Sequence, residues 1–241
     1  MSVIGRTNRL TIHSSPLTAP ESLTTDITMY IAIEGVIGVG KTTLARLLQA
    51  VFEAELLLEV FEENPFLSDF YADRERYAFQ TQIFFLLSRY YQQRRVVSEC
   101  LAGGGNLVAD YTFEKDALFA QINLKGDELE MYHRVHEALA EKVIPPDLIV
   151  YLRADTSVLM ERIELRDRPY ERNMDRFYIN DLNQAYEAFF NDIQQRRSPV
   201  LVLDTNHLNY VHYPENLKIV ENRIRQALKL VPFQPELPLS V

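Results

Sequence analysis

Cysteine is almost absent from this chain, whose 241 residues include one cysteine, Cys100, and no tryptophan. One cysteine cannot form an internal disulfide, so the fold is not cross-linked and a reducing compartment fits best. Long apolar runs are also missing, since none approaches the roughly 20 residues that cross a bilayer. Residues 1–28 lack the apolar centre of a signal peptide. We therefore expect an intracellular protein of the cytoplasm, with no membrane partner.

Basic residues are in deficit. Lysine and arginine together number 25, against 34 acidic residues, which gives a net charge of −9 at pH 7. Nucleic-acid polymers are bound through net basic surfaces, because their phosphates must be neutralised. The acidic balance therefore argues against a nucleic-acid polymer as the main partner, and it leaves small anions as ligands for local clusters of arginine and lysine.

The two ends of the chain show no regular pattern of apolar residues. Residues 1–28 are rich in serine and threonine and are interrupted by two prolines, so we interpret them as a disordered lead. Three prolines over residues 232–241 break any helix and predict a flexible, proline-rich tail. One folded domain is expected over residues 29–231, with the lead dispensable and Met29 as a candidate start of translation.

Between these ends, short apolar runs alternate with stretches long enough for helices. Such alternation predicts an α/β fold with a parallel sheet that helices cover on both faces. Apolar residues at helical spacing predict helices over residues 42–52 and 77–97. The expected strands are residues 29–34, 55–60, 106–110, 147–152 and 199–204.

The segment GVIGVGKT, residues 35–42, follows the first expected strand and precedes the first expected helix. It matches the phosphate-loop pattern G-x-x-x-x-G-K-[ST], whose glycines let backbone N–H groups turn toward phosphate oxygens. In such a loop Lys41 bridges the terminal phosphates and Thr42 offers its hydroxyl to Mg²⁺. The pattern predicts a site for a nucleotide with Mg²⁺, but by itself it does not choose among GTPases, ATPases and small-molecule kinases. The expected ATP-binding residues of the loop are Gly35, Val36, Ile37, Gly38, Val39, Gly40, Lys41, Thr42 and Thr43.

Further ordered motifs occur between Met29 and Asp204, among them EVFEENPFL at residues 59–67 and ADYTFEKDALFA at residues 109–120. In these motifs the sequence resembles the deoxyribonucleoside kinase family, especially its bacterial deoxyguanosine and deoxyadenosine kinase branch. The resemblance implies a P-loop nucleoside kinase fold: a five-stranded parallel sheet flanked by helices, with an arginine-rich lid. It also implies a homodimer built through long helices, and ATP-dependent phosphorylation of the 5′-hydroxyl of a deoxyribonucleoside.

Glu59 follows an apolar run and is therefore expected at the carboxyl end of the second strand, where open α/β sheets bind ligands. The resemblance implies that this glutamate is the general base, which accepts the proton of the 5′-hydroxyl as the oxygen attacks phosphorus. Glu62 and Glu63 are the neighbouring carboxylates that could be mistaken for it, although both fit a solvated loop better.

The arginine-rich stretch RIELRDRPYER covers residues 162–172. Such a run is most often a solvated helix face. Its resemblance to the lid of the family implies instead that Arg162, Arg166 and Arg168 close over the ATP phosphates, with Arg162 and Arg166 as catalytic residues. The family pattern has glycine where Asp167 stands, which puts the geometry of the lid in question.

Other residues match positions at which the family binds the acceptor. Tyr71 and Glu171 match the pair that hydrogen-bonds the sugar 3′-hydroxyl. Asp110 ends the third expected strand, where a carboxylate both faces the acceptor and binds Mg²⁺. The family usually has arginine after this acid, whereas Tyr111 stands here. Lys115 and the lid arginines are the candidates for the missing charge.

Three polar residues are the candidates for reading the base. Gln82 and Arg89 are seven residues apart, which places them about two turns apart on one helix face. Asp116 matches the family position whose carboxylate pairs with the arginine. Such a pair presents fixed donors and acceptors to a base edge, which favours purines, with deoxyguanosine first and deoxyadenosine second. A structural salt bridge, or activity on pyrimidines as well, is the open alternative.

Two other functions compete with this one. A nucleoside monophosphate kinase similar to thymidylate kinase shares the phosphate loop and a lid, but it needs a site for an acceptor phosphate. A P-loop regulatory switch is a second alternative, against which the sequence lacks the D-x-x-G and N-K-x-D patterns of GTPases. His133 and His136, three residues apart, could suggest a metal pair, but positions on the surface are the better interpretation.

Overall fold

The computed structural model describes residues 28–192 and 197–230. The lead predicted up to residue 28 therefore falls almost entirely outside the described residues, and so does the tail predicted for residues 232–241. Five strands form one fully parallel sheet in the order β2-β3-β1-β4-β5, as the alternating pattern predicts. The strands are β1 Tyr30–Glu34, β2 Ala54–Leu57, β3 Asn106–Ala109, β4 Leu148–Arg153 and β5 Val200–Asp204.

Two strands end earlier than the sequence predicts. β2 ends at Leu57 and not at residue 60, and β3 ends at Ala109 and not at Asp110. The Asp110 N–H still donates to the Leu57 carbonyl at 3.1 Å. The N–H of Glu59, however, donates to the Asp110 carboxylate at 2.8 Å. The Asp110 side chain thus replaces a backbone carbonyl as the acceptor. The pairing of β2 with β3 ends there, and the loops that carry Glu59 and Asp110 begin.

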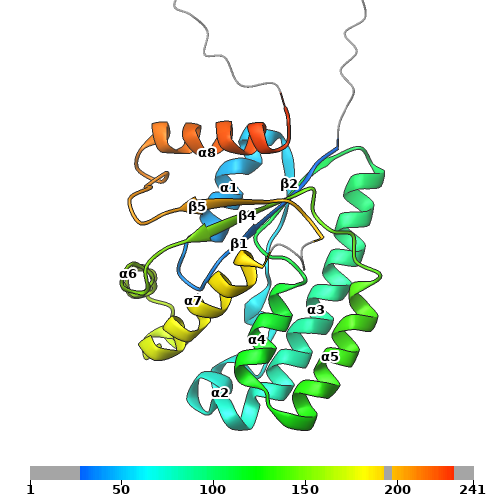
Figure 1. Cartoon of the computed structure of the whole chain (residues 1–241), viewed down its shortest axis with the longest axis vertical. Coiled ribbons are helices and arrows are strands. Elements are labelled where there is room, and N and C mark those ends of the chain that lie inside the picture. The colour runs from blue at the N-terminus through cyan, green and yellow to red at the C-terminus, as the bar shows by residue number, and fades with distance from the viewer. Residues whose placement is uncertain (1–27, 193–196, 231–241) are drawn as a thin grey trace, which may run out of the picture.

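Helices cover both faces of the sheet (Figure 1). On one face α1 Lys41–Phe52 and α8 Pro214–Ala227 pack together, and α1 begins directly after the phosphate loop. The other face carries α3 Arg74–Ala102, α4 Lys115–Asn123, α5 Gly126–Ala140 and α7 Arg176–Asn191. Shorter elements join them: η1 Phe61–Glu63, α2 Leu67–Ala72, α6 Thr156–Arg166 and η2 Pro169–Glu171.

Every residue of β1 is buried, because alternate side chains point to opposite faces and each face is covered. Ile31 and Ile33 belong to the large apolar cluster, whereas Tyr30 and Ala32 belong to a smaller one under α3. The continuous apolar pattern of the first strand is therefore the mark of its central place in the sheet.

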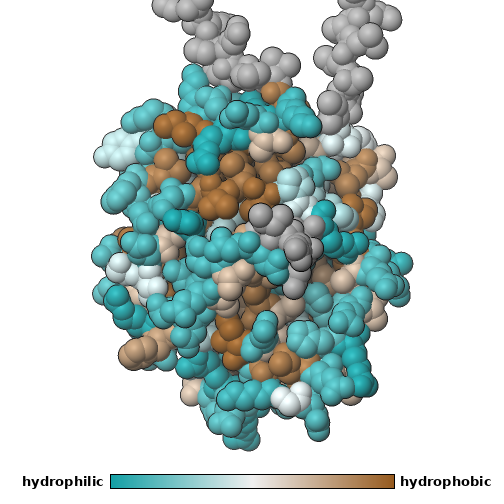
Figure 2. Space-filling model, in the orientation of Figure 1, coloured by the Kyte–Doolittle hydropathy of each residue, from teal (hydrophilic) through white to brown (hydrophobic). Residues whose placement is uncertain are grey.

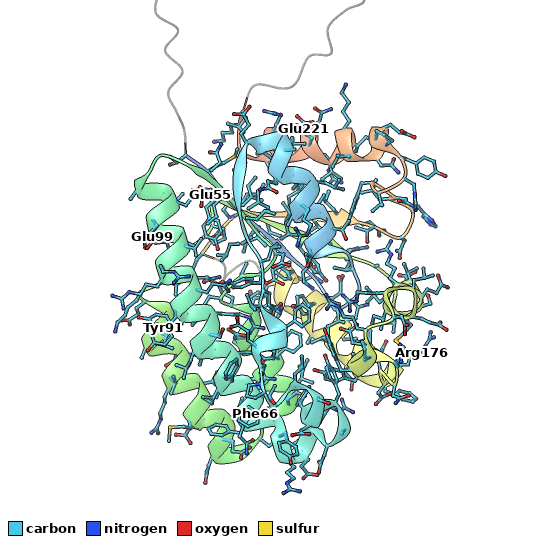
Figure 3. All side chains as sticks on the ribbon, turned by 180° about the vertical axis from the view of Figure 1, so that it is seen from behind. Glu55, Phe66, Tyr91, Glu99, Arg176 and Glu221 are labelled. Atoms are coloured by element: carbon cyan, nitrogen blue, oxygen red, sulfur yellow. The ribbon has the colours of Figure 1, made fainter. Side chains whose placement is uncertain are left out.

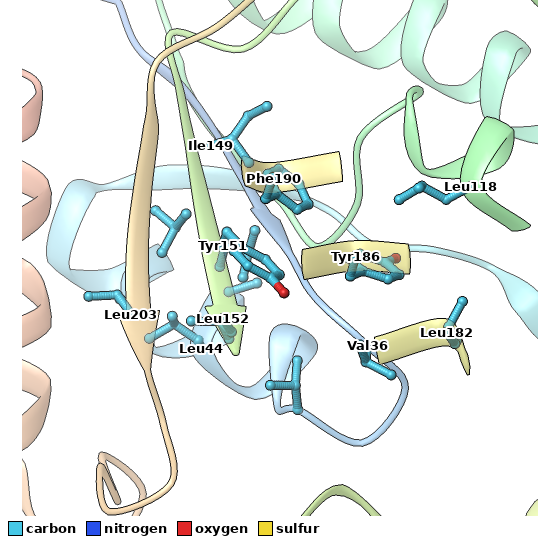
Figure 4. Packing of buried hydrophobic residues seen from close by; sticks show 14 of the residues in the cluster. Val36, Leu44, Leu118, Ile149, Tyr151, Leu152, Leu182, Tyr186, Phe190 and Leu203 are labelled. Carbon is cyan, nitrogen blue, oxygen red and sulfur yellow. The ribbon is translucent and has the colours of Figure 1, made fainter. Parts of the chain in front are cut away.

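Aromatic rings fix α7 against the sheet (Figure 4). The rings of Tyr151, on β4, and Phe190, on α7, stack with their centroids 4.2 Å apart, and the Tyr186 ring lies 6.1 Å from that of Phe190. Offset or tilted ring pairs of this kind add about 0.5–1.5 kcal/mol beyond the burial of their area. The C-terminal half of α7 is thereby fixed against β4.

The surface is mainly hydrophilic on the face shown in Figure 2, with apolar residues gathered near its centre, over β5. β5 is an edge strand, and its Val202 side chain is 38% exposed. In the part of the chain that the structure describes, no helix is long and apolar enough to cross a membrane.

Candidate active site

The phosphate loop turns sharply between β1 and α1. Gly35, Gly38 and Gly40 all have positive φ angles, of 145°, 86° and 105°. A Cβ atom on Gly35 would lie 2.3 Å from the Leu152 carbonyl oxygen, so a side chain cannot be fitted there. These backbone conformations are open to glycine and costly for other residues. The loop thus needs its glycines for its shape, as the sequence pattern predicts.

Lys41, the first residue of α1, lies over this loop. Its ammonium group donates to the carbonyls of Gly35 at 2.7 Å and Val36 at 3.1 Å. Burial and, second, the positive charge of Lys115 lower the pKa of Lys41 to about 8, although the nearby carboxylates of Glu34, Glu59 and Asp110 oppose both effects. An amine in this position is ready to exchange its carbonyl partners for phosphate oxygens.

Thr42 and Asp110 face each other across the site. The Thr42 hydroxyl donates to one Asp110 carboxylate oxygen at 2.5 Å, and the other oxygen accepts from the Glu59 N–H at 2.8 Å. Asp110 therefore connects the phosphate loop to the segment that carries Glu59. A hydroxyl and a carboxylate are also oxygen ligands of the kind that Mg²⁺ takes beside substrate phosphates. The donor set fits the predicted metal.

The Glu59 carboxylate is held between two cations. One of its oxygens accepts from the Arg89 guanidinium, and the other lies 2.5 Å from the Lys115 Nζ. Burial by itself raises the pKa of Glu59, but the charges and hydrogen bonds of Arg89 and Lys115 outweigh it and hold the pKa well below the usual range. Of the two neighbouring glutamates, Glu63 is exposed, whereas the Glu62 side chain lies outside the described part of the chain.

Arg89 forms a second ion pair, with Asp116 at the start of α4. Asp116 is fully buried and Arg89 is 5% exposed, so both charges are withdrawn from water. The Arg89 guanidinium also lies 4.6 Å from the centroid of the Phe85 ring. Gln82, two turns earlier on α3, is buried and lines the same cavity. The Arg89–Asp116 pair that the resemblance implied is present, and Arg89 also holds Glu59.

Tyr71 and Glu171 lie at the far end of this cavity. Tyr71 stacks on Tyr170, with ring centroids 6.1 Å apart and planes 13° apart. Burial raises the pKa of Tyr71, so its phenol keeps its proton and can donate it to a hydrogen bond. Glu171 is 4% exposed and accepts from Arg166, and its other oxygen lies 3.6 Å from Arg168. Two of the arginines predicted for the lid are therefore paired with Glu171.

The third lid arginine is anchored elsewhere. Arg162 donates to the Val39 carbonyl at 3.2 Å and to Thr205, whose hydroxyl lies at 3.1 Å and whose carbonyl lies at 2.7 Å. It thereby ties α6 to the phosphate loop and to the segment after β5. Asp167 ends α6 with a φ of 48° and is paired with Arg172 at 2.7 Å. The left-handed turn that a glycine would favour is therefore kept by aspartate, which tolerates it.

Most of the predicted residues converge on two cavities. The second cavity is formed by the phosphate loop, Arg162 and residues 206–212, and it shares several residues with the first. Asp116 lies behind Arg89 and does not line the first cavity. Predicted site residues that line the first cavity are Ile37, Gly38, Lys41, Thr42, Glu59, Tyr71, Gln82, Arg89, Asp110, Arg166, Arg168 and Glu171.

Three features were not found from the sequence. Glu34 is 1% exposed and accepts from the N–H groups of Gly35 and Thr112, and its position at the end of an apolar strand was the available signal. Phe61 lies under Arg168, whose guanidinium carbon is 4.1 Å from the ring centroid. Residues 206–212 have no motif, so only the folded chain shows them beside the phosphate loop.

His136 does not take the surface position that the sequence suggested. It is partly buried and stacks on Phe113, with ring centroids 4.7 Å apart. Burial lowers the pKa of His136 and favours the neutral ring. No group of three or more His, Cys, Asp or Glu side chains among the described residues could hold a metal ion. The histidine pair is therefore explained by packing.

Comparison with known proteins identifies similar chains. The family model described as deoxynucleoside kinase matches residues 31–229. Deoxyguanosine kinase of Bacillus subtilis (strain 168) is 36% identical over 201 residues, which cover 83% of this chain and 97% of that protein. Deoxyadenosine kinase of Dictyostelium discoideum is 36% identical over 177 residues, which cover 71% of this chain and 70% of that protein.

A solved structure is similar over the same region. It is deoxyadenosine kinase from M. mycoides with the products dCMP and a flexible dCDP bound. The TM-score is 0.71 at 25% sequence identity, and the match covers 82% of this chain and 99% of that one. The similarity therefore extends over most of the chain.

Proposed function

Because the chain belongs to the deoxynucleoside kinase family, we propose that it transfers the γ-phosphoryl group of ATP to the 5′-hydroxyl of a purine deoxyribonucleoside. It is an enzyme that phosphorylates a nucleoside, and the finer assignment of donor and base is the proposal. The observation that carries it is the position of Glu59. Its carboxylate lies in one cavity with Lys41 and Thr42 of the phosphate loop and with Tyr71 and Glu171.

The donor side is the phosphate loop together with the second cavity. Lys41 already points over the loop, where it would bind the terminal phosphates. Residues 206–212 and Arg162 form the far wall, against which the base of the donor nucleotide would lie. Thr42 and Asp110 would hold Mg²⁺, and the metal would supply charge neutralisation to the phosphates.

The acceptor side extends from Glu59 to the lid. Tyr71 and Glu171 would hydrogen-bond the 3′-hydroxyl, one as a donor and one as an acceptor. This fixes the sugar with its 5′-hydroxyl toward Glu59, which accepts the proton as the oxygen attacks the γ-phosphorus. A weakly basic carboxylate is sufficient, since phosphoryl transfer proceeds through a loose transition state and needs positioning more than a strong base.

The preference for purines, with deoxyguanosine before deoxyadenosine, is supported by two observations. The similar proteins include deoxyguanosine and deoxyadenosine kinases. Gln82 and Arg89 line the cavity, and the buried Asp116 holds Arg89 from behind, so the guanidinium and the Gln82 amide would present fixed hydrogen-bonding groups to a base. Thymine has no N7 acceptor and carries a methyl group that these polar atoms would crowd, so thymidine should be a poor substrate. The M. mycoides enzyme holds dCMP, which makes deoxycytidine the informative comparison.

Family membership weighs against the two competing functions. A monophosphate kinase needs cations to bind the acceptor phosphate, but Arg166 and Arg168 are paired with Glu171 on the acceptor side. A regulatory switch has no use for a carboxylate clamped beside its phosphate loop, as Glu59 is. Both ATP and free deoxynucleosides are metabolites of the cytoplasm, and this is the location that we propose.

A homodimer through α3 and α5 completes the proposal. These two helices run side by side on one flank of the molecule (Figure 1). Leu87 and Tyr91 on α3 are 38% and 67% exposed, and Met131 on α5 is 52% exposed. Tyr91 lies on the outer side of α3 (Figure 3). Apolar side chains on neighbouring exposed helices suit the core of a contact between subunits.

The test is an assay of kcat/KM on the four deoxynucleosides and their four monophosphates with ATP. We expect turnover of deoxyguanosine first and deoxyadenosine second, and none of the monophosphates. Glu59→Gln should lower kcat by about 100-fold or more, whereas Glu63→Gln, a change at an exposed neighbour, should not. Outright preference for thymidine would disprove the purine assignment, and normal turnover in Glu59→Gln would disprove the role of the base.

A further inference from the structure

The tyrosine at position 111 does not act in the active site. Tyr111 is fully buried in the smaller apolar cluster, and its hydroxyl donates to the Gln92 Oε1 at 2.6 Å. Its ring and its hydroxyl are both engaged with α3 and the sheet. A positive charge near Glu59 must therefore come from another position in the chain.

Lys115 supplies such a charge from the first turn of α4. Its side chain is 6% exposed, and its Nζ lies 2.5 Å from the Glu59 Oε2. The same ammonium group is 5.6 Å from the centroid of the Phe119 ring, which adds a favourable cation–π contact. Lys115 therefore reaches Glu59 from the opposite side to Arg89, which binds the Oε1.

The two cations that hold Glu59 differ in their freedom. Arg89 is fixed between Glu59 and the fully buried Asp116, and its planar guanidinium binds both. Lys115 has one ion-pair partner among the described residues, which is Glu59. A lysine is a compact charge on a flexible four-carbon stem. It can therefore follow a negative charge that moves by a few ångström, whereas Arg89 cannot without leaving Asp116 unpaired.

Lys115 is also close to the phosphate loop. Its charge is the second-largest influence on Lys41, whose pKa burial already lowers. Both lysines line the first cavity, together with Thr42 and Glu59. The ammonium of Lys115 thus contacts Glu59 and is near enough to Lys41 to lower the pKa of that lysine. In the proposed reaction the phosphoryl group passes from ATP to the 5′-hydroxyl inside the cavity that both lysines line.

We infer that Lys115 is a catalytic residue that holds Glu59 before the reaction and then contacts the transferring phosphoryl group. This inference rests on the proposed function. The 5′-oxygen forms a bond to the γ-phosphorus, and the bond from that phosphorus to the β–γ bridging oxygen breaks. The electron pair of that bond leaves with ADP, and the proton of the hydroxyl passes to Glu59. Neutralisation of Glu59 frees the ammonium of Lys115, which keeps its own proton and binds the equatorial phosphoryl oxygens.

A purely structural role makes a different prediction. If Lys115 only neutralised the Glu59 carboxylate, its removal would lower the stability of the enzyme. Adding Glu59→Gln to a Lys115 variant would then restore that stability. Glu59→Gln would also lower the activity by the same factor whether Lys115 is present or absent. If Lys115 also stabilises the transition state, its removal lowers kcat in a folded enzyme. KM for the deoxynucleoside should then change little, because the contact is made with the phosphoryl group and not with the sugar or base.

The experiment compares Lys115→Met, Lys115→Arg and the matched control Lys125→Met, a change at an exposed lysine at the start of α5. Steady-state kinetics are measured on the full chain with ATP and deoxyguanosine, and melting temperatures establish folding. We expect Lys115→Met to lower kcat by about 100-fold, as the loss of one transition-state contact does. KM for deoxyguanosine should stay within a factor of three. The kcat of Lys115→Arg should be at least tenfold higher than that of Lys115→Met, and the kcat of Lys125→Met should match that of the wild type.

Two outcomes would overturn the inference. One is a Lys115→Met enzyme whose kcat stays within a factor of three of the wild type. The other is a folded Lys115→Arg enzyme that is no more active than Lys115→Met. If Lys115→Met does not fold, the activity of Lys115→Arg is the deciding measurement. An active wild type in either case leaves the proposed function standing. A wild type inactive on all four deoxynucleosides would refute the proposed function and this inference together.

Discussion

Arg89 neutralises the negative charges of two carboxylates in the site. Asp116 is fully buried, the Glu59 side chain is 15% exposed, and Arg89 is paired with both. Removal of one partner from a buried ion pair leaves an uncompensated charge, which is far more costly than the loss of an exposed pair. The contacts that we propose to prepare the site for a base therefore also contribute to the stability of the fold.

Arg89→Met should lower the free energy of unfolding by about 3–5 kcal/mol, because Asp116 loses its partner. Arg89→Met combined with Asp116→Ala should lose less than the single change, since no buried charge is left unpaired. Urea denaturation of the wild type and both variants measures the two differences. As a control, Arg134→Met removes an exposed pair with Glu130 and should cost less than about 1 kcal/mol. A double variant that is less stable than Arg89→Met would contradict this account.

At the scale of elements, Glu34 joins three of them at the end of β1. Its carboxylate accepts from the N–H groups of Gly35 at 3.1 Å and Thr112 at 2.6 Å. It also accepts from the hydroxyls of Thr112 at 3.1 Å and Tyr186, on α7, at 3.2 Å. All four partners are donors, so only a carboxylate with two accepting oxygens satisfies them. One carboxylate thereby fixes the positions of the phosphate loop, the loop after β3 and α7 relative to one another.

Glu34→Gln should destabilise the chain by about 1–3 kcal/mol, because its amide nitrogen would face donors that need an acceptor. Turnover should fall as well, since Gly35 begins the phosphate loop and Thr112 lies between Asp110 and Lys115. Thermal melting and kcat report the two effects. The control is Glu187→Gln, because the Tyr151 hydroxyl can still donate to an amide oxygen and the other partner, Arg153, forms a half-exposed ion pair at 3.8 Å. Equal effects of the two substitutions would show that Glu34 has no special role.

At the scale of the whole molecule, the exposed face of α3 and α5 carries the proposed homodimer. Tyr91→Asp places a charge at the centre of this face and should convert the dimer to a monomer of 28.0 kDa. Phe177→Asp is the matched control, because Phe177 is 80% exposed but lies on α7. Light scattering after size-exclusion chromatography gives the masses. A wild type that is monomeric at micromolar concentration would refute the proposed dimer.

The local features of this protein are determined by its sequence. The phosphate loop follows from three glycines whose positive φ angles no other residue takes as cheaply, and from the adjoining Lys41 and Thr42. The five parallel strands follow from apolar runs of strand length separated by helical stretches, and every residue of β1, at the centre, is buried. The Arg89–Asp116 pair was predicted as well, but with the help of a family resemblance.

Tertiary structure decided how these features meet. The sequence could not show that Glu59 lies between Arg89 and Lys115, because the three come from different elements and ion pairs have no sequence period. The sequence placed Glu59 at the end of β2. The strand stops at Leu57, because the Glu59 N–H donates to the Asp110 carboxylate and not to a backbone carbonyl of β3. Local spacing determines which groups one element presents. Which charges share a buried site depends on packing between elements, since each group is stabilised there only by partners that the fold brings near.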